Sequence, residues 1–122
     1  IELAATKCAC EKRTEDSLKV LSKLVSLANK EEESSNIPEV GFQFHHEVAV
    51  ASENIYYSMI IQTFKPLYTM FYQIYLSTEC QEDVVKSLQN ILTAIQMKDS
   101  DRAESVINEV IDRWLNAYKK NK

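Results

Sequence analysis

The stretch that decides the fold is the run Phe44-His45-His46-Glu47-Val48-Ala49-Val50-Ala51-Ser52-Glu53-Asn54. Apolar residues recur at helical spacing in and around this run, so it predicts an amphipathic helix that begins near Pro38. Its apolar stripe is Val40, Phe44, Val48, Ala51 and Ile55. His45 lies about 100° round the helix from Phe44, half-turned toward the interior. We expect Asn54 to be the C-cap, because asparagine tolerates the left-handed conformation.

The rest of the chain has the same helical character. One Gly and two Pro in 122 residues leave few residues suited to the tight turns of a sheet. Two further helices are expected in the first part of the chain, over residues 2–12 and, with Thr14 as N-cap, over residues 14–28. A long aromatic helix is expected from about Ile55 to Ser77, kinked at Pro66.

The last two helices are marked by their start signals. Residues 78–81 have the form of a capping box for a fifth helix, and Asp99 or Ser100 caps the last one. The sequence therefore predicts an all-α antiparallel bundle of about six helices, folded as a single domain over residues 1–122.

Composition excludes several classes of function. The formal charge of −4 argues against binding DNA by this chain alone, and no stretch reaches the roughly 20 apolar residues of a membrane span. Cys8 and Cys10 point about 200° apart on a helix and cannot form a disulfide, so the cysteines indicate free thiols in a reducing cytoplasm. The carboxylate groups near Asp99 could in principle act as catalytic acids or bases, but their position at a helix start is explained by capping. We therefore expect no enzyme activity.

Two features remain as candidate sites, each with a structural alternative. His45 can bind a ligand or form a hydrogen bond within the core. A metal site would need ligands one helical turn away, where Gly41, Val48 and Ala49 stand. The second feature is the aromatic segment, which is either core plus a dimer face or a source of tyrosine hydroxyls in a cavity. Its members are Tyr56, Tyr57, Phe64, Tyr68, Phe71, Tyr72 and Tyr75.

Four segments, in order, resemble the effector-binding C-terminal domain (FCD) of the FadR branch of the GntR transcription regulators. Glu2 to Glu11 resembles its acidic and then alanine-rich helix, and Thr14 to Leu18 its Thr-x-Glu-Asp-Leu helix start. Phe44 to Asn54 resembles the Phe-His … Ala-Ser-Gly-Asn signature, with Glu53 in place of glycine. Ala94 to Ala103 resembles the Ala-Ile … Gly-Asp … Ala pattern before the last helix.

The resemblance implies a bundle with an internal cavity for a small, usually anionic metabolite. It also implies that the protein forms a homodimer. Contact with DNA is then expected only through an N-terminal winged helix-turn-helix domain outside this chain, so the chain is expected to be a fragment of a longer protein. Many members hold a divalent metal at positions that match Gly41, His45, Leu88 and Val110. Three of these residues cannot ligate, so we expect no metal and no cofactor.

The replaced ligands imply a drier and roomier cavity, which suits an apolar or amphipathic effector. Lys65 to Thr69 is also similar to the equivalent stretch of members that respond to fatty acyl-CoA, so acyl-CoA or another lipid-like acid is the hypothesis for the effector. His45 and Tyr68 are expected to be the polar groups of the cavity. Its expected lining is Gly41, His45, Tyr68, Tyr72, Leu88 and Val110.

These expectations describe a cytoplasmic ligand-sensing and dimerising domain of a bacterial transcription regulator. The alternative is a free-standing helical interaction module whose aromatic face binds a partner protein.

Overall fold

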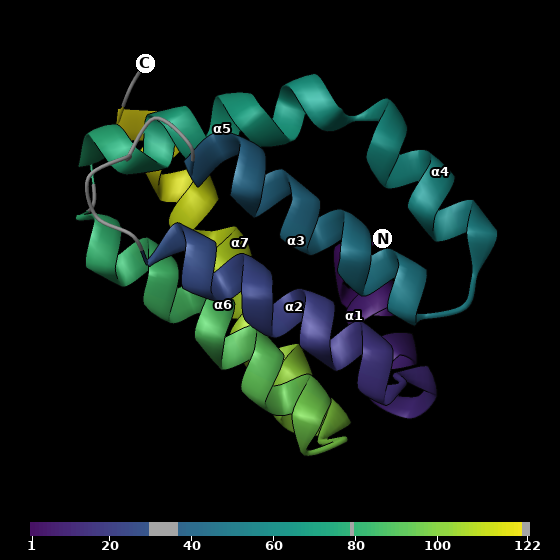
Figure 1. The fold of residues 1–122 in the computed structure, drawn as a ribbon. Helices are drawn as coiled ribbons and strands as arrows, with labels where there is room; N and C mark the ends of the chain where they lie inside the picture. The colour runs from purple at the N-terminus through teal and green to yellow at the C-terminus, as the bar shows by residue number, and fades with distance from the viewer. Residues whose placement is uncertain (30–36, 79, 121–122) are drawn as a thin grey trace.

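The computed structural model of the protein describes residues 1–29, 37–78 and 80–120. These residues form seven α-helices and no strand, arranged as a bundle (Figure 1), which confirms the all-α prediction. The helices are α1 (Glu2–Lys12), α2 (Glu15–Ala28), α3 (Ile37–Ala51), α4 (Ile55–Thr63), α5 (Lys65–Thr78), α6 (Gln81–Gln96) and α7 (Ser100–Lys120).

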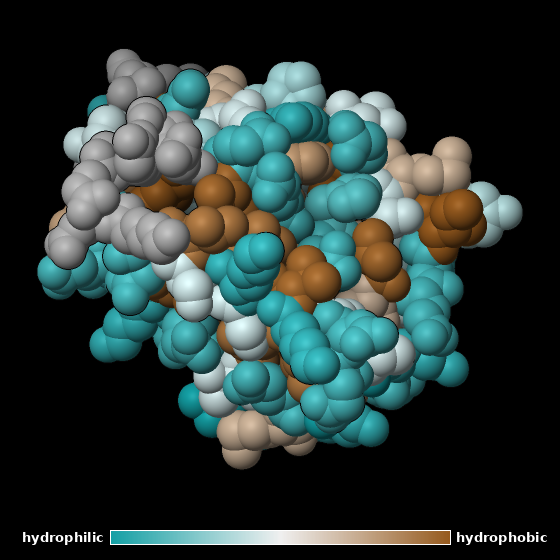
Figure 2. All heavy atoms as spheres, viewed as in Figure 1, coloured by the Kyte–Doolittle hydropathy of each residue, from teal (hydrophilic) through white to brown (hydrophobic). Residues whose placement is uncertain are grey.

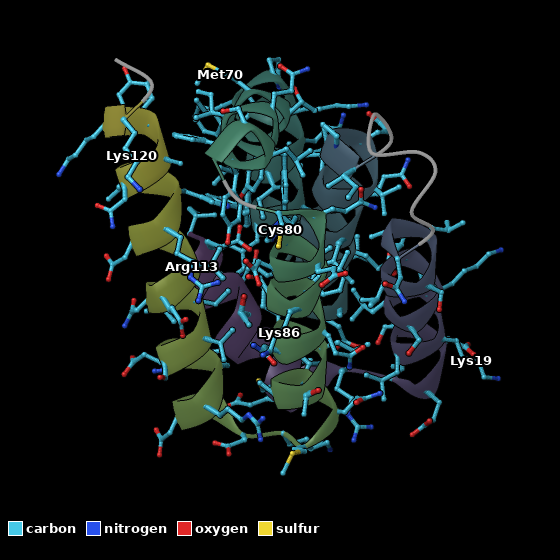
Figure 3. The ribbon with its side chains drawn as sticks, turned by 90° about the vertical axis from the view of Figure 1, so that its left-hand side faces the viewer. Lys19, Met70, Cys80, Lys86, Arg113 and Lys120 are labelled. Atoms are coloured by element: carbon cyan, nitrogen blue, oxygen red, sulfur yellow. The ribbon has the colours of Figure 1, made fainter. Side chains whose placement is uncertain are left out.

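The short helix α1 lies inside the bundle, where it packs against α3, α6 and α7. It can approach these helices closely because the residues on its inner side are small: Ala5, Ala9 and Cys10 are all fully buried. Helices α7, α6 and α2 lie side by side in Figure 3, with α3 and α5 behind and above them. Helix α4 is the outlying element of Figure 1 and packs mainly on α3.

Two of the expected helix starts are confirmed by their hydrogen bonds. The Thr14 hydroxyl accepts from the backbone N–H of Ser17 at 3.1 Å, and the Ser17 hydroxyl accepts from the N–H of Thr14 at 2.9 Å. This reciprocal capping box satisfies two N–H groups that have no partner inside α2. Asp99 accepts from the N–H of Arg102 at 3.0 Å and so caps α7.

The prediction that Asn54 is a C-cap is wrong. The left-handed residue after α3 is Glu53, with φ 60°, and the side chain of Asn54 instead accepts from the N–H of Tyr56 as the N-cap of α4. The signature that Phe44 to Asn54 resembles has glycine at the position of Glu53, and a glycine there would adopt the left-handed backbone without steric cost.

The prediction of one kinked helix from Ile55 to Ser77 is also wrong, because the chain ends α4 at Thr63 and begins α5 at Lys65. Pro66 lacks the N–H that would continue the helix, and its ring disfavours helical backbone before it. The expected capping box over residues 78–81 falls partly outside the described residues. Helix α5 extends to Thr78, and the N-cap of α6 is Cys80, without a side-chain cap bond.

The buried side chains form two separate clusters. The larger cluster is the bundle core, which runs from Ala9 and Leu21 to Trp114. The smaller one joins α1, α3 and α4 through Ala5, Phe42, Ala49 and Ile61. Tyr68 packs against both clusters, so it marks the point where α4 and α5 meet the core.

Candidate functional site

His45 lies at the centre of a buried polar network between α1, α3 and α5. Its side chain is 1% exposed. Ring atom Nδ1 lies 2.6 Å from Oε1 of Glu2, and Nε2 lies 2.6 Å from the hydroxyl of Tyr72. When Nδ1 carries the proton, it donates to Glu2 and Nε2 accepts from Tyr72, so every polar group of the trio has a partner.

The carboxylate of Glu2 is held from two sides. One oxygen pairs with His45, and the other accepts a hydrogen bond from the hydroxyl of Tyr68. Burial raises the pKa of Glu2, but the attraction of His45 and the hydrogen bonds from His45 and Tyr68 outweigh it and lower the pKa below 4.5. Burial and the neighbouring carboxylate raise the pKa of both Tyr68 and Tyr72, so both keep their protons. The result is a carboxylate bound by the hydroxyl group of Tyr68 and by the ring of His45, which in turn contacts the hydroxyl group of Tyr72.

Helix geometry explains how α3 and α5 build this network. Tyr68 and Tyr72 are four residues apart and therefore lie on one face of α5, and Gly41 and His45 share a face of α3 in the same way. A Cβ atom on Gly41 would lie only 2.6 Å from Cζ of Tyr72. The missing side chain is what lets the Tyr72 ring lie across α3 and reach His45.

The indole ring of Trp114, on α7, packs against the side chains of the network. It contacts His45, Tyr68 and Tyr72 edge-on at centroid distances of 5.5, 5.9 and 5.5 Å, and it stacks on Phe71 at 5.8 Å. The side chain is only 8% exposed, yet its indole N–H has no hydrogen-bond partner among the described residues. A buried donor without a partner costs free energy unless something else accepts from it.

An apolar pocket of about 210 Å³ lies beside the network, between α1, α4, α5 and α7. Glu2, Tyr68 and Trp114 contribute to its wall, and every other lining residue is apolar: Ile1, Ile60, Ile61, Phe64, Leu67 and Phe71. Phe64 is 50% exposed and Leu67 is 43% exposed, so the pocket opens to the surface between α4 and α5.

The six residues expected to line the cavity do not all meet there. His45, Tyr68 and Tyr72 come together with Gly41 beneath them, and of the six only Tyr68 lies in the pocket wall. Leu88 and Val110 are packed in the bundle core. Val110 also lines a groove between α6 and α7, together with Lys86 and Arg113 (Figure 3).

The residues at the family's metal positions do not fit a metal ion. Gly41, Leu88 and Val110 carry no donor atom, and both ring nitrogens of His45 are already hydrogen-bonded. No cluster of three or more His, Cys, Asp or Glu side chains suited to a metal occurs within residues 1–29, 37–78 and 80–120. His45 and Tyr68 instead bind the carboxylate of Glu2.

The sequence did not reveal the roles of Glu2 and Trp114. Glu2 is 43 residues from its histidine partner, so no local spacing connects the two. Trp114 packs against His45, Tyr68 and Tyr72, but this packing does not explain its unpaired N–H. The one signal for Glu2 was its acidic place at the start of the alanine-rich helix.

The described part of the chain contains no helix long and apolar enough to cross a membrane. Among curated proteins, no sequence matches the chain significantly. Among solved structures, the chain is similar to Escherichia coli McbR/YncC, a GntR-family regulator, with a TM-score of 0.66 and 17% identity. The match covers 99% of this chain but 60% of that one, and at this identity it shows a shared fold.

Sequence comparison with family models gives the assignment. The model of the FCD domain matches residues 1–113, which is most of the chain. The matched segment contains α1 to α6 and includes Glu2, His45 and Tyr68. The chain therefore belongs to the FCD domain family, the helical effector-binding domains of GntR-type transcription regulators.

Proposed function

We propose that the pocket beside Glu2, Tyr68 and Trp114 is the effector site, and that the effector is a small apolar carboxylic acid. The observation that carries this proposal is the combination of an apolar wall with groups that already hold a carboxylate, His45 and Tyr68. Ligand sites typically pair a mostly apolar lining with a few convergent polar groups.

The size of the pocket narrows the class of effector. A cavity of about 150 Å³ is enough to hold benzene, so 210 Å³ admits an aromatic ring or a short acyl chain. A long fatty acyl-CoA would place only part of its chain here, with the nucleotide outside. Among lipid-like acids we therefore favour short-chain and aromatic ones.

Trp114 is the single tryptophan of the chain and lies in the pocket wall, so its fluorescence reports binding directly. The experiment titrates the chain with benzoate and hexanoate, and in parallel with benzyl alcohol and hexanol. We expect saturable changes with the acids and weaker binding of the alcohols. If neither acid changes the emission or raises the melting temperature, the proposal is wrong.

A matched pair of variants locates the site. Ile60→Glu places a negative charge in the pocket wall and is expected to weaken acid binding at least tenfold. Gln62→Glu adds the same charge on the exposed side of α4, outside the pocket lining, and is expected to leave binding unchanged. Equal effects of the two variants would place the acid elsewhere.

We also propose that the chain forms a homodimer through α4 and α5 and that it regulates DNA binding by a domain outside this sequence. Apolar side chains are exposed along these helices, including Ile55 at 67% and Tyr56 at 71%. Figure 2 shows apolar atoms at the edge where α4 lies in Figure 1. Such a patch is typical of interfaces. Sedimentation of the chain should show a dimer that Tyr56→Glu dissociates; a monomer for the unmodified chain would refute this proposal.

A further inference from the structure

We infer that the carboxylate of Glu2 occupies the anion position of the effector site, so that an acid binds by displacing Glu2 from His45 and Tyr68. This inference rests on the proposed function, because it names how the same pocket is regulated. Glu2 then acts as an internal competitor, because its carboxylate occupies the site when no effector is bound.

Two groups from different helices bind the carboxylate of Glu2. The two oxygens of Glu2 are bound by donors from two different helices, Nδ1 of His45 on α3 and the hydroxyl of Tyr68 on α5. These groups form a cradle for any carboxylate, because nothing in their geometry depends on the glutamate stem. Glu2 fills the cradle from α1 and is also part of the pocket wall, so pocket and cradle are continuous.

Glu2 lies nearer the surface than the histidine that it contacts. The Glu2 side chain is 11% exposed and lies at the edge of the network. On displacement it turns outward and becomes hydrated. His45 is 1% exposed and Tyr68 is half-buried, and both rings pack edge-on against Trp114. The cradle therefore persists when its present occupant departs.

The indole N–H of Trp114 has no hydrogen-bond partner among the described residues. It is a buried donor in the pocket wall that Glu2 does not satisfy. An effector oxygen that reaches this N–H would accept from it, and a bound acid would then gain a hydrogen bond that the internal carboxylate does not make. This difference favours exchange of Glu2 for the effector.

The test compares Kd values for benzoate and benzyl alcohol, measured by Trp114 fluorescence, in the unmodified chain and in Glu2→Ala. We expect Glu2→Ala to tighten benzoate binding at least tenfold and to leave the alcohol within about twofold. Glu11→Ala removes an exposed carboxylate from the same helix and controls for net charge, with no change expected. If Glu2→Ala does not fold, Glu2→Gln keeps the size of the side chain without its charge and is expected to tighten benzoate binding in the same direction.

Carbon NMR of the Glu2 carboxyl group supplies a second readout. Its pKa should be below 4.5 in the free chain and should rise toward 4.5 when benzoate is bound, because Glu2 then loses His45 and Tyr68. Unchanged or weaker benzoate binding in the Glu2 variants, with Ile60→Glu still blocking it, would overturn the displacement while leaving the proposed effector site intact. Absence of benzoate binding in all variants would overturn both.

Discussion

Substituting Gly41 by alanine tests the packing on which the network depends. A Cβ at this position would lie 2.6, 2.7 and 2.9 Å from Cζ, Cε2 and Cε1 of the Tyr72 ring. Ordinary carbon contacts lie at about 3.5–4.0 Å, so the ring would have to retreat by about 1 Å. Tyr72 is 2% exposed, and its hydroxyl is 2.6 Å from His45. The ring therefore has no free space to move into without breaking that bond.

Gly41→Ala is expected to change the free energy of unfolding in three ways, two of them unfavourable and one favourable. Overpacking a core costs about 1–3 kcal/mol, and leaving buried polar partners unpaired costs about 1–3 kcal/mol more. Replacing a glycine inside a helix by alanine stabilises the helix by about 1 kcal/mol, because alanine has the higher helix propensity. The net loss in the free energy of unfolding is then roughly 3 kcal/mol, which corresponds to a fall in Tm of about 10 °C for a domain of this size.

Urea denaturation and thermal melting of Gly41→Ala measure this loss. The control is Gly41→Ala in a Tyr72→Leu background, where the ring is absent and the substitution should be neutral or slightly stabilising. An increase in Tm for the single variant, as expected of a glycine in an unobstructed helix, would refute the close-contact argument. So would an equal loss of stability in both backgrounds.

Two further predictions concern charge and backbone strain. Because the folded state lowers the pKa of Glu2, its ionised form contributes stability at pH values above 4.5, and this contribution disappears as pH falls below that value. Urea denaturation from pH 7 to pH 3 should show a steeper acid loss for the unmodified chain than for Glu2→Gln, and parallel curves would contradict the assignment. Glu53 and Lys98 have left-handed backbone, with φ 60° and 54°. Glu53→Gly and Lys98→Gly should each raise the free energy of unfolding by about 1 kcal/mol, whereas Glu47→Gly, inside α3, should lower it by about 1 kcal/mol. Differential scanning calorimetry measures all three, and destabilisation by both left-handed substitutions would exclude strain at these positions.

The sequence was sufficient for features that depend on local pattern. Thr14 is the N-cap of α2 as predicted, and the predicted stripe of α3 is buried from Val40 to Ala51. Ile55, expected in the same stripe, instead begins α4 and is exposed. The boundary between α4 and α5 was missed because apolar residues continue across Phe64, and only the backbone shows where the hydrogen bonding changes. Likewise, Asn54 is suited to both ends of a helix, and the structure assigns it to the start of α4.

The candidate site was only partly predictable for a related reason. The sequence drew attention to His45 and to the aromatic segment that contains Tyr68 and Tyr72, and the structure places these three side chains together. Glu2 belongs to a helix whose inward side is otherwise alanine and cysteine, and its pairing with α3 is a tertiary contact. Leu88 and Val110 were inferred from ligand positions of the family, but without ligating atoms these positions become ordinary core.

The separation of the small apolar cluster from the main core gives the molecule two levels of cooperativity. Ile61 is the single buried residue of α4, and burying one isoleucine contributes only about 1.5–3 kcal/mol. Helix α4 can therefore detach at a small fraction of the cost of global unfolding. Because Ile60 and Ile61 form one wall of the pocket, movement of α4 would widen the mouth of the pocket and leave the rest of the bundle intact. Amide hydrogens of α4 should accordingly exchange with solvent long before those of α6 and α7.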